Sequence, residues 1–213
     1  MTQVRFEGLR SPALSALSRS PAALELSTGS VARWDHAAVA DDHPKVARVI
    51  AAAARYGIAI DVLRFPAGTR SATDAANAVG ALVAQIVKSL VFMADGAPVI
   101  ALVSGSDRLD PERLAATLGV ARVDRATGDE ARAATGYAIG GIPPFAHDEE
   151  LRVVMDARLL RHDTVWAAAG LPDAVFAIGP AQLAIAARAR VAEIAEISDG
   201  SPGSTLTVDP SAG

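Results

Sequence analysis

The spacing of apolar residues alternates along the chain between the period of a helix and the period of a strand. Helices are expected where a capping residue or a proline precedes an apolar stripe, at Pro44, Ser71, Pro111, Thr127 and Pro180. Strands are expected where apolar residues alternate or run together, over residues 58–65, 85–94, 98–104, 151–156 and 174–178.

Local residues predict one hairpin and one further helix. Asp95-Gly96 lies between the runs 85–94 and 98–104, and this dipeptide favours a tight β-hairpin. Residues 163–169 are expected to form one or two helical turns, ended by Gly170-Leu171-Pro172. Helices mixed with strands, including an antiparallel hairpin, predict a mixed α+β domain (α/β with a mixed sheet) and not a doubly wound one.

Composition divides the chain into three parts. Residues 1–38 are rich in arginine, serine and alanine without a sustained period, which favours a disordered extension or a start codon assigned too far upstream. A targeting sequence is the alternative, but Glu7 and Glu25 argue against it. Residues 198–213 predict a flexible tail, so the folded domain is expected to span residues 39–197.

Composition also limits the classes of function. The 213 residues are 51% hydrophobic, largely through alanine, which is enough for one domain with a core of small side chains. The absence of cysteine excludes disulfides and thiol catalysis and fits the cytoplasm. The net charge of -4 argues against a generic nucleic-acid binder, which would normally be basic, and no run approaches the ~20 apolar residues that span a membrane.

Lys88 has the most unusual setting of any residue. It is one of only two lysines, with Lys45, and lies within the apolar run 85–92. Such a lysine either faces water from a strand or places its ammonium in a cleft, where burial would lower its pKa below about 10.4. In a cleft it could hold an anion or a carbonyl group.

A segment rich in glycine and proline follows downstream. Residues 135–145 contain Gly140-Gly141 and Pro143-Pro144, which fit neither a helix nor a central strand. The backbone of such a rigid loop can approach a ligand closely. We expect this loop to line a site together with Lys88, which favours the cleft alternative.

Several short segments, taken in order, make the chain recognisable. They are SATDAA at 71–76, QIVKSLVF at 85–92, ALVSG at 101–105, TGYAIGGIPPF at 135–145 and WAAAG at 166–170. The ordered set resembles the YbaK/EbsC family of free-standing aminoacyl-tRNA deacylases, which are related to the editing insertion of bacterial prolyl-tRNA synthetases. The resemblance covers roughly residues 44–190.

The resemblance implies a mixed, mostly antiparallel sheet that curls into a partial barrel flanked by helices. It also implies hydrolysis of the ester of a mischarged tRNA, with tRNA-Pro carrying a small non-cognate amino acid as the expected substrate. The family's key lysine falls on Lys88, the next position on Ser89, the backbone-lined pocket on Gly140-Gly141 and the loop entrance on Gly136. Some members carry a serine in a late Ser-Gly-Gly turn. Here residues 166–170 have no hydroxyl, so no serine-dependent step is carried over.

Four further residues are assigned to substrate binding by their position. Ile142 and Pro143 belong to the glycine-rich loop. His147 follows this loop and could bind substrate or relay a proton, although a loop histidine is more often simply solvated. Arg70 precedes a helix start, where anions bind, and is a candidate contact for the tRNA acceptor end.

Two other functions stay open at this stage. The fold could serve as a non-catalytic module that binds an aminoacylated tRNA end or a small ligand, as a regulator or synthetase-associated domain, and the missing serine favours this alternative. A Schiff-base lysine enzyme would need a second activating group beside Lys88. The expected partners are the acceptor end of an aminoacyl-tRNA and prolyl-tRNA synthetase, but not DNA or a membrane. A monomer without metal or cofactor is expected.

Overall fold

The structure is a computed structural model that describes residues 43–65 and 71–197. The extension 1–38, Arg70 and the tail 198–213 lie outside the described residues. The helices are α1 (Pro44–Ala54), α2 (Ala72–Val79), α3 (Pro111–Leu118), α4 (Gly128–Thr135) and α5 (Pro180–Ala186), with 3-10 helices η1 (Val83–Gln85) and η2 (Ala157–Arg161). The strands are β1 (Val62–Arg64), β2 (Val87–Ala94), β3 (Ala97–Ser104), β4 (Val123–Arg125), β5 (Arg152–Asp156), β6 (Val165–Ala168), β7 (Ala174–Ile178) and β8 (Arg190–Ala192).

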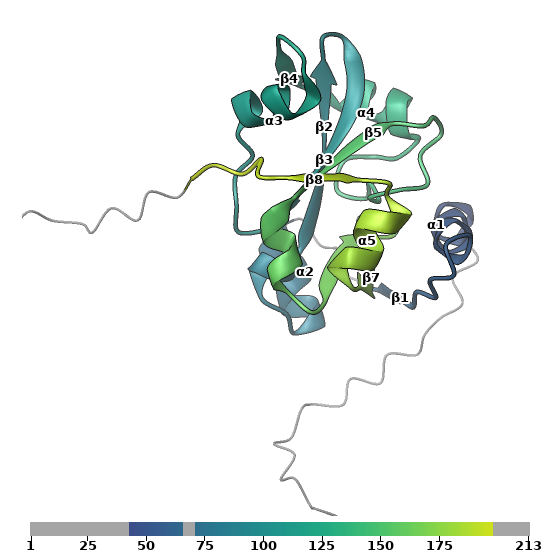
Figure 1. Cartoon of the computed structure of the whole chain (residues 1–213). Coiled ribbons are helices and arrows are strands. Elements are labelled where there is room, and N and C mark those ends of the chain that lie inside the picture. The colour runs from purple at the N-terminus through teal and green to yellow at the C-terminus, as the bar shows by residue number, and fades with distance from the viewer. Residues whose placement is uncertain (1–42, 66–70, 198–213) are drawn as a thin grey trace, which may run out of the picture. The chain divides into compact units, whose positions relative to one another are not determined.

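The larger sheet has five strands in the order β4-β2-β3-β5-β8 (Figure 1). Strand β2 pairs antiparallel with β3 and β4, whereas β5 runs parallel to both β3 and β8. The β2–β3 hairpin turns at Asp95 and Gly96, whose φ angles of 48° and 84° are those of a type I′ turn. The hairpin predicted from Asp95-Gly96 is therefore confirmed.

The smaller sheet has three antiparallel strands in the order β1-β7-β6. It meets the larger sheet at a single bridge between Ile86 and Trp166, beside the start of β2. The two sheets are not closed into a barrel. The predicted mixed and mostly antiparallel α/β architecture is confirmed, since among the strands of the described residues only the β3–β5 and β5–β8 pairings are parallel, as is the isolated Ile86–Trp166 bridge.

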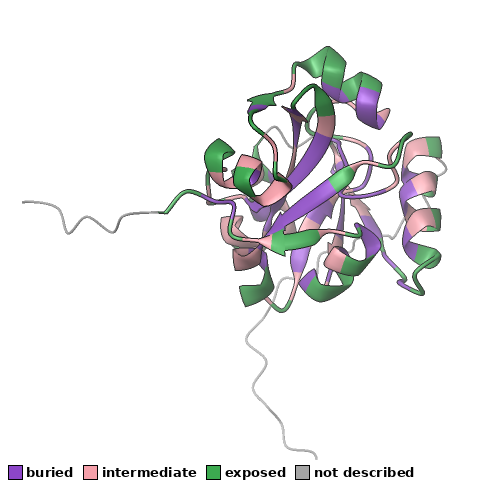
Figure 2. Ribbon diagram, turned by 45° about the horizontal axis from the view of Figure 1, so that its top comes forward, coloured by how far each residue is buried: buried purple, intermediate pink, exposed green. Residues whose placement is uncertain are grey.

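The buried side chains form two main clusters on opposite faces of the larger sheet. One cluster joins that sheet to the smaller sheet, to α1 through Val46 and Val49 and to α5 through Leu183. The other lies under α3 and includes Leu114, Phe92 and Ile194. Figure 2 shows the consequence, with burial concentrated along the strands and on the inward faces of the helices. A third, smaller group packs α2 against Ile86.

The predicted helix starts agree with the caps in the structure. Ser71 and Asp74 form a capping box at α2, and Thr127 and Glu130 form one at α4. At α3 the Asp110 carboxylate accepts hydrogen bonds from the first-turn amides. These local signals depend on a few neighbouring residues, which is why the sequence was sufficient to place them.

The helix predicted over residues 163–169 was wrong, because Val165–Ala168 within this range form strand β6. Alanine favours helices, but Trp166 to Ala168 pair instead with residues of β7, and tertiary pairing overrides a weak local preference. The strand predicted over 58–65 is only Val62–Arg64. The short strands β4 and β8 and the 3-10 helices were not predicted.

Candidate functional site

A cavity of about 330 Å³ lies between the first half of β2, strand β6 and helix α2. Strand β4 pairs with β2 only at Phe92–Ala94. On that side of β2, residues Val87 to Leu90 are not paired with β4 and border the cavity. The lining residues are mostly aliphatic. They are Ser71, Ala72, Ala75, Val79, Ile86, Val87, Lys88, Ser89, Leu90, Ile139, Gly140, Ile142, Trp166, Ala167, Ala168, Pro172 and Val175.

Lys88 lines this cavity from β2, opposite Val103 of β3, and is half-buried. Its Nζ donates hydrogen bonds to the carbonyl oxygen of Gly105, at 3.2 Å, and to that of Asp107. Burial lowers the pKa of Lys88 below its ordinary value of 10.5, and the nearby Asp107 carboxylate opposes this shift. An ammonium has three N–H donors, so one remains for a ligand.

Ser89 follows Lys88 and lines the same cavity. Its Oγ is buried and has no hydrogen-bond partner within the described residues. Leaving a hydroxyl buried without a partner costs about 1–3 kcal/mol. Because this Oγ has almost no accessible surface, it would meet a ligand in the cavity only after the Ser89 side chain rotates.

The glycine-rich loop places Gly140 and Ile142 in the cavity wall. Gly140 has a φ of 89°, which side chains rarely adopt. Gly141 is buried behind the wall, and a Cβ there would lie 2.7 Å from the carbonyl carbon of Leu171. Only glycine therefore lets this loop pack against the Leu171-Pro172 backbone, which brings Gly140 and Pro172 to the same cavity.

Other predicted site residues lie away from this cavity. Gly136 ends α4 with a φ of 80°, which is a structural role. His147 borders a second, more polar cavity near α1 and α5, and its Nε2 donates a hydrogen bond to the carbonyl oxygen of Pro143 at 2.8 Å. Burial lowers the pKa of His147, so the ring is neutral near pH 7 and holds the loop. Pro143 is buried and is not among the residues that line the Lys88 cavity.

Sequence reasoning missed part of the cavity. Trp166 was not proposed as a site residue, yet it lines the cavity together with Ala167, Ala168 and Pro172. Val165 and Ala167 are buried while Trp166 and Ala168 are partly exposed, which is the alternation of a strand. This alternation of buried and partly exposed positions could have indicated a strand, but it is not visible in the sequence because residues 167–169 are all alanine.

Charged groups are scarce in the cavity wall. Lys88 is the one charged side chain among its described lining residues, and none of them is aspartate, glutamate or histidine. In residues 43–65 and 71–197 no group of three or more His, Asp or Glu side chains could hold a metal ion.

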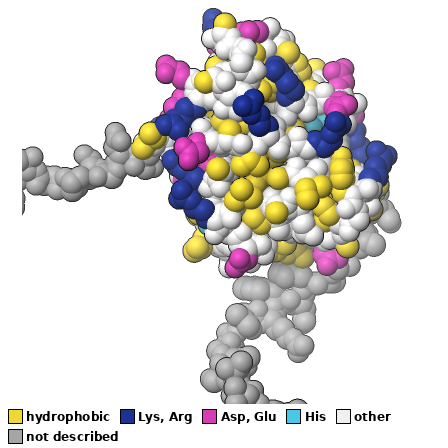
Figure 3. All heavy atoms as spheres, viewed as in Figure 1, with side chains coloured by type: hydrophobic (Ala, Val, Ile, Leu, Met, Phe, Trp, Pro, Cys, Tyr) yellow, Lys and Arg dark blue, Asp and Glu magenta, His cyan; other side chains and the backbone are white. Residues whose placement is uncertain are grey.

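On the face drawn in Figure 3, arginine and lysine side chains are interspersed with acidic ones. No helix in the described part is long and apolar enough to cross a membrane.

The family model for the aminoacyl-tRNA editing domain matches residues 66–185. The match includes the Lys88 cavity, the glycine-rich loop and strand β6. The chain therefore belongs to the aminoacyl-tRNA editing domain family.

Individual relatives agree with this assignment. The uncharacterized protein YwhH of Bacillus subtilis is 32% identical over 126 residues, covering 58% of this chain and 78% of YwhH. The proline–tRNA ligase of Citrifermentans bemidjiense is 36% identical over 92 residues, which are 43% of this chain and 16% of the ligase. A solved structure described as a candidate trans-editing enzyme for prolyl-tRNA synthetase has 42% identity and a TM-score of 0.68, covering 72% of this chain and 98% of that one.

Proposed function

We propose that this protein hydrolyses the ester bond of mischarged tRNA, as a trans-editing deacylase. The observation that carries the proposal is the position of Lys88, whose half-buried side chain belongs to the lining of an aliphatic cavity and whose Nζ uses two of its three donors within the described residues. Membership of the editing-domain family and the likeness to a candidate trans-editing enzyme support it.

The reaction needs little chemical machinery, because an aminoacyl ester is already activated. A water oxygen attacks the carbonyl carbon, the bond to the ribose oxygen breaks, and that oxygen takes up a proton. In our proposal Lys88 stabilises the negative charge that develops on the carbonyl oxygen, or binds the terminal adenosine. The Ser89 hydroxyl and the Gly140 backbone orient the aminoacyl group.

No residue is assigned as the general base. The described cavity lining has neither a carboxylate nor an imidazole. In our proposal the proton of the attacking water is relayed, through another water or the neighbouring ribose hydroxyl of the tRNA, to the ribose oxygen that leaves. This makes positioning and charge stabilisation the main contributions of the protein.

The proposed substrate is tRNA-Pro that carries a small non-cognate amino acid. Aliphatic walls such as Ala72, Ala75 and Val79 favour a small side chain without charge. The similarity to proline–tRNA ligases supports tRNA-Pro and makes prolyl-tRNA synthetase the proposed delivery partner, in the cytoplasm. With a net charge of -4, we expect weak, strongly salt-dependent binding of uncharged tRNA.

A non-catalytic binding module is the second candidate. The absence of an acid or histidine from the described lining favours it, as does the lack of a hydroxyl in residues 166–170. Such a module would bind an aminoacylated tRNA end without turnover.

The experiment that separates the two is a deacylation panel. Full-length protein is mixed with tRNA-Pro charged with alanine, serine, threonine, cysteine or proline, and the remaining ester is followed with time. Loss of one small non-cognate amino acid, with prolyl-tRNA spared, is the expected result. Tight binding of an aminoacyl-tRNA without faster hydrolysis than in buffer would favour the binding module and contradict the deacylase.

A further inference from the structure

The ammonium of Lys88 is held by a turn at the end of β3. Its Nζ donates to the carbonyl oxygens of Gly105 and Asp107, both within this turn. A Cβ on Gly105 would collide with the carbonyl oxygen of Val83, so the turn packs closely against η1. The position of the turn therefore determines where the ammonium of Lys88 lies.

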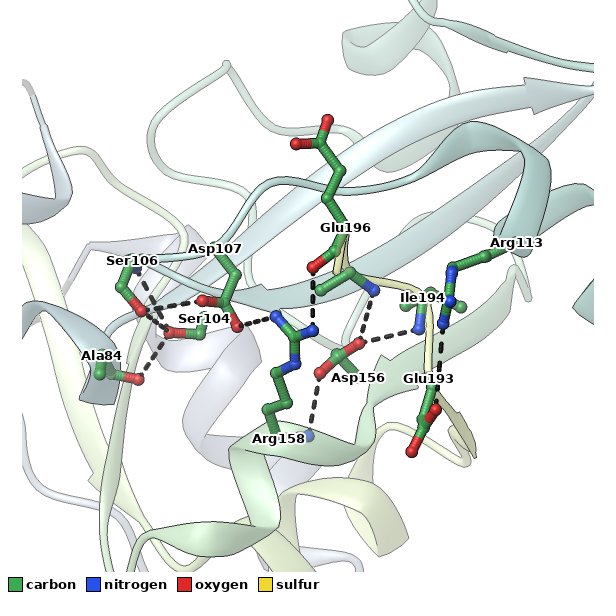
Figure 4. Close-up of polar contacts among 12 residues, drawn as sticks. Ala84, Ser104, Ser106, Asp107, Arg113, Asp156, Arg158, Glu193, Ile194 and Glu196 are labelled. Carbon is green, nitrogen blue, oxygen red and sulfur yellow. Dashed lines mark hydrogen bonds and ion pairs between the residues drawn. The ribbon is translucent and has the colours of Figure 1, made fainter. Parts of the chain in front are cut away.

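The Asp107 side chain is fixed in turn by Arg158 of η2. One carboxylate oxygen of Asp107 accepts a hydrogen bond from Arg158 Nη1 at 3.2 Å, and the other accepts one from Ser106 Oγ at 3.1 Å (Figure 4). The two side chains of this ion pair are only 27% and 17% exposed, so solvent screens the pair less than one on the open surface. Arg158 Nη2 also donates to the carbonyl oxygen of Glu196, at 2.8 Å. One guanidinium thus joins the turn to the segment 194–196.

Segment 194–196 is itself anchored. The buried Asp156 carboxylate accepts hydrogen bonds from the amides of Ile194, at 2.8 Å, and Ala195, at 2.7 Å. The Glu196 amide donates to the carbonyl oxygen of Arg108 at 2.8 Å, directly after Asp107. We call Asp107, Asp156, Arg158 and the segment 194–196 the clamp. Through these bonds the clamp holds the C-terminal side of the turn, at Asp107 and Arg108.

We propose that Asp107 and Arg158 are positioning residues, whose ion pair holds the turn that places the Lys88 ammonium at the cavity. Neither residue lines the cavity, so both act through Lys88. The effect on catalysis rests on the proposed deacylase function, whereas the effect on the position of Lys88 does not.

The charged groups that act on Lys88 allow the two variants to be distinguished. The Asp107 carboxylate raises the pKa of Lys88, whereas burial, Arg108 and Arg125 lower it. Replacing Asp107 with asparagine removes the charge and retains the backbone carbonyl. The pKa of Lys88 is then expected to fall further. Replacing Arg158 with glutamine breaks the ion pair and displaces the turn.

The chain offers a clean spectroscopic test, since Lys45 and Lys88 are its only lysines. Full-length protein labelled with [ε-¹³C]lysine gives two side-chain signals, and Lys45→Arg identifies the one from Lys88. Asp107→Asn and Arg158→Gln are compared with Arg113→Gln as a matched control. Arg113 is similarly exposed and pairs with Asp110 and Glu193, next to the clamp, but does not bond to the Lys88 turn.

We expect the Lys88 signal to move in both variants, and in Asp107→Asn we expect it to titrate at lower pH. The Lys45 signal should stay in place, which would show that the fold is intact. Deacylation should fall about tenfold or more in kcat with KM little changed if Lys88 stabilises the developing negative charge, and KM should rise instead if Lys88 binds the terminal adenosine. The double variant should be no slower than the slower single one, since both act through Lys88.

An unchanged Lys88 signal and titration in both variants would overturn the proposal, as would an equal displacement in Arg113→Gln. If the intact protein shows no deacylation at all, the proposed function fails. The Lys88 signal still decides whether the pair positions the ammonium.

Discussion

The cavity beside β2 and the clamp behind it differ in how their polar groups are satisfied. In the clamp, Asp156 accepts three backbone hydrogen bonds and Arg158 joins two partners. In the cavity, Ser89 Oγ is buried without a partner in the described chain, and Lys88 keeps a free donor. The polar groups of the clamp are satisfied within the described chain. At the cavity, the remaining donor of Lys88 is available to a ligand.

The largest expected effect comes from breaking the clamp at Asp156. Asp156→Ala leaves the amides of Arg158, Ile194 and Ala195 without their acceptor in a buried site. We expect a loss of about 3–5 kcal/mol in the free energy of unfolding, measured with urea. Glu196→Ala is the control, because the clamp uses only the backbone of Glu196. Equal stability of the two variants would show that Asp156 is not the anchor.

The second effect concerns the cavity wall. Gly141→Ala places a Cβ 2.8 Å from Leu171 Cα, and a backbone cannot move aside as a flexible side chain can. We expect a loss of about 1–3 kcal/mol from overpacking, together with slower deacylation as Gly140 is displaced. Gly128→Ala is the matched control, since its Cβ would meet only Ile139 Cδ1 at an ordinary 3.7 Å. Thermal unfolding of both variants checks the difference, and a fully stable Gly141→Ala would contradict it.

Two serines on the β2–β3 hairpin allow an unpaired hydroxyl beside the cavity to be compared with a hydrogen-bonded one. Ser89 pairs with Leu102 and Ser104 with Val87 in the same β2–β3 ladder, but only Ser104 Oγ is hydrogen-bonded, to Ala84 at 2.9 Å. Removing the unpaired hydroxyl in Ser89→Ala should stabilise the protein by about 1 kcal/mol and weaken deacylation. Ser104→Ala should destabilise it by a similar amount. Unfolding curves that move in the same direction would remove the evidence for a ligand at Ser89.

The smallest effect is a pH dependence outside the cavity. Burial lowers the pKa of His147 below 6.5, so the folded protein holds fewer protons than the unfolded chain. The stability linked to the neutral ring is present above pH 6.5 and is lost as the pH falls through the lowered pKa. His147→Gln should therefore lose less stability than the intact protein between pH 7 and pH 5. Parallel losses would show that another group controls this range.

Local features of this fold could be predicted from sequence, and long-range ones could not. The Asp95-Gly96 hairpin and the helix starts at Ser71 and Thr127 depend on neighbouring residues and were predicted correctly. Strand β6 was mistaken for a helix because its run of alanines favours a helix locally and hid the alternation that pairing with β7 produces. The same limit applies to the site. Lys88, Ser89 and Gly140 were proposed from motifs, whereas Trp166, Asp107 and Arg158 join the region only through tertiary structure.

The central claim is that the lysine beside the cavity carries the reaction. The most direct test is the single-turnover deacylation rate of Lys88→Ala beside Lys45→Ala, using the mischarged tRNA-Pro on which the intact protein is most active. Lys45 is the matched control. It belongs to α1, its Nζ lies over the ring of Tyr137, and it is not among the residues that line the cavity. We predict a loss of about 100-fold or more for Lys88→Ala and an unchanged rate for Lys45→Ala. A Lys88→Ala variant as fast as the intact protein would contradict the account.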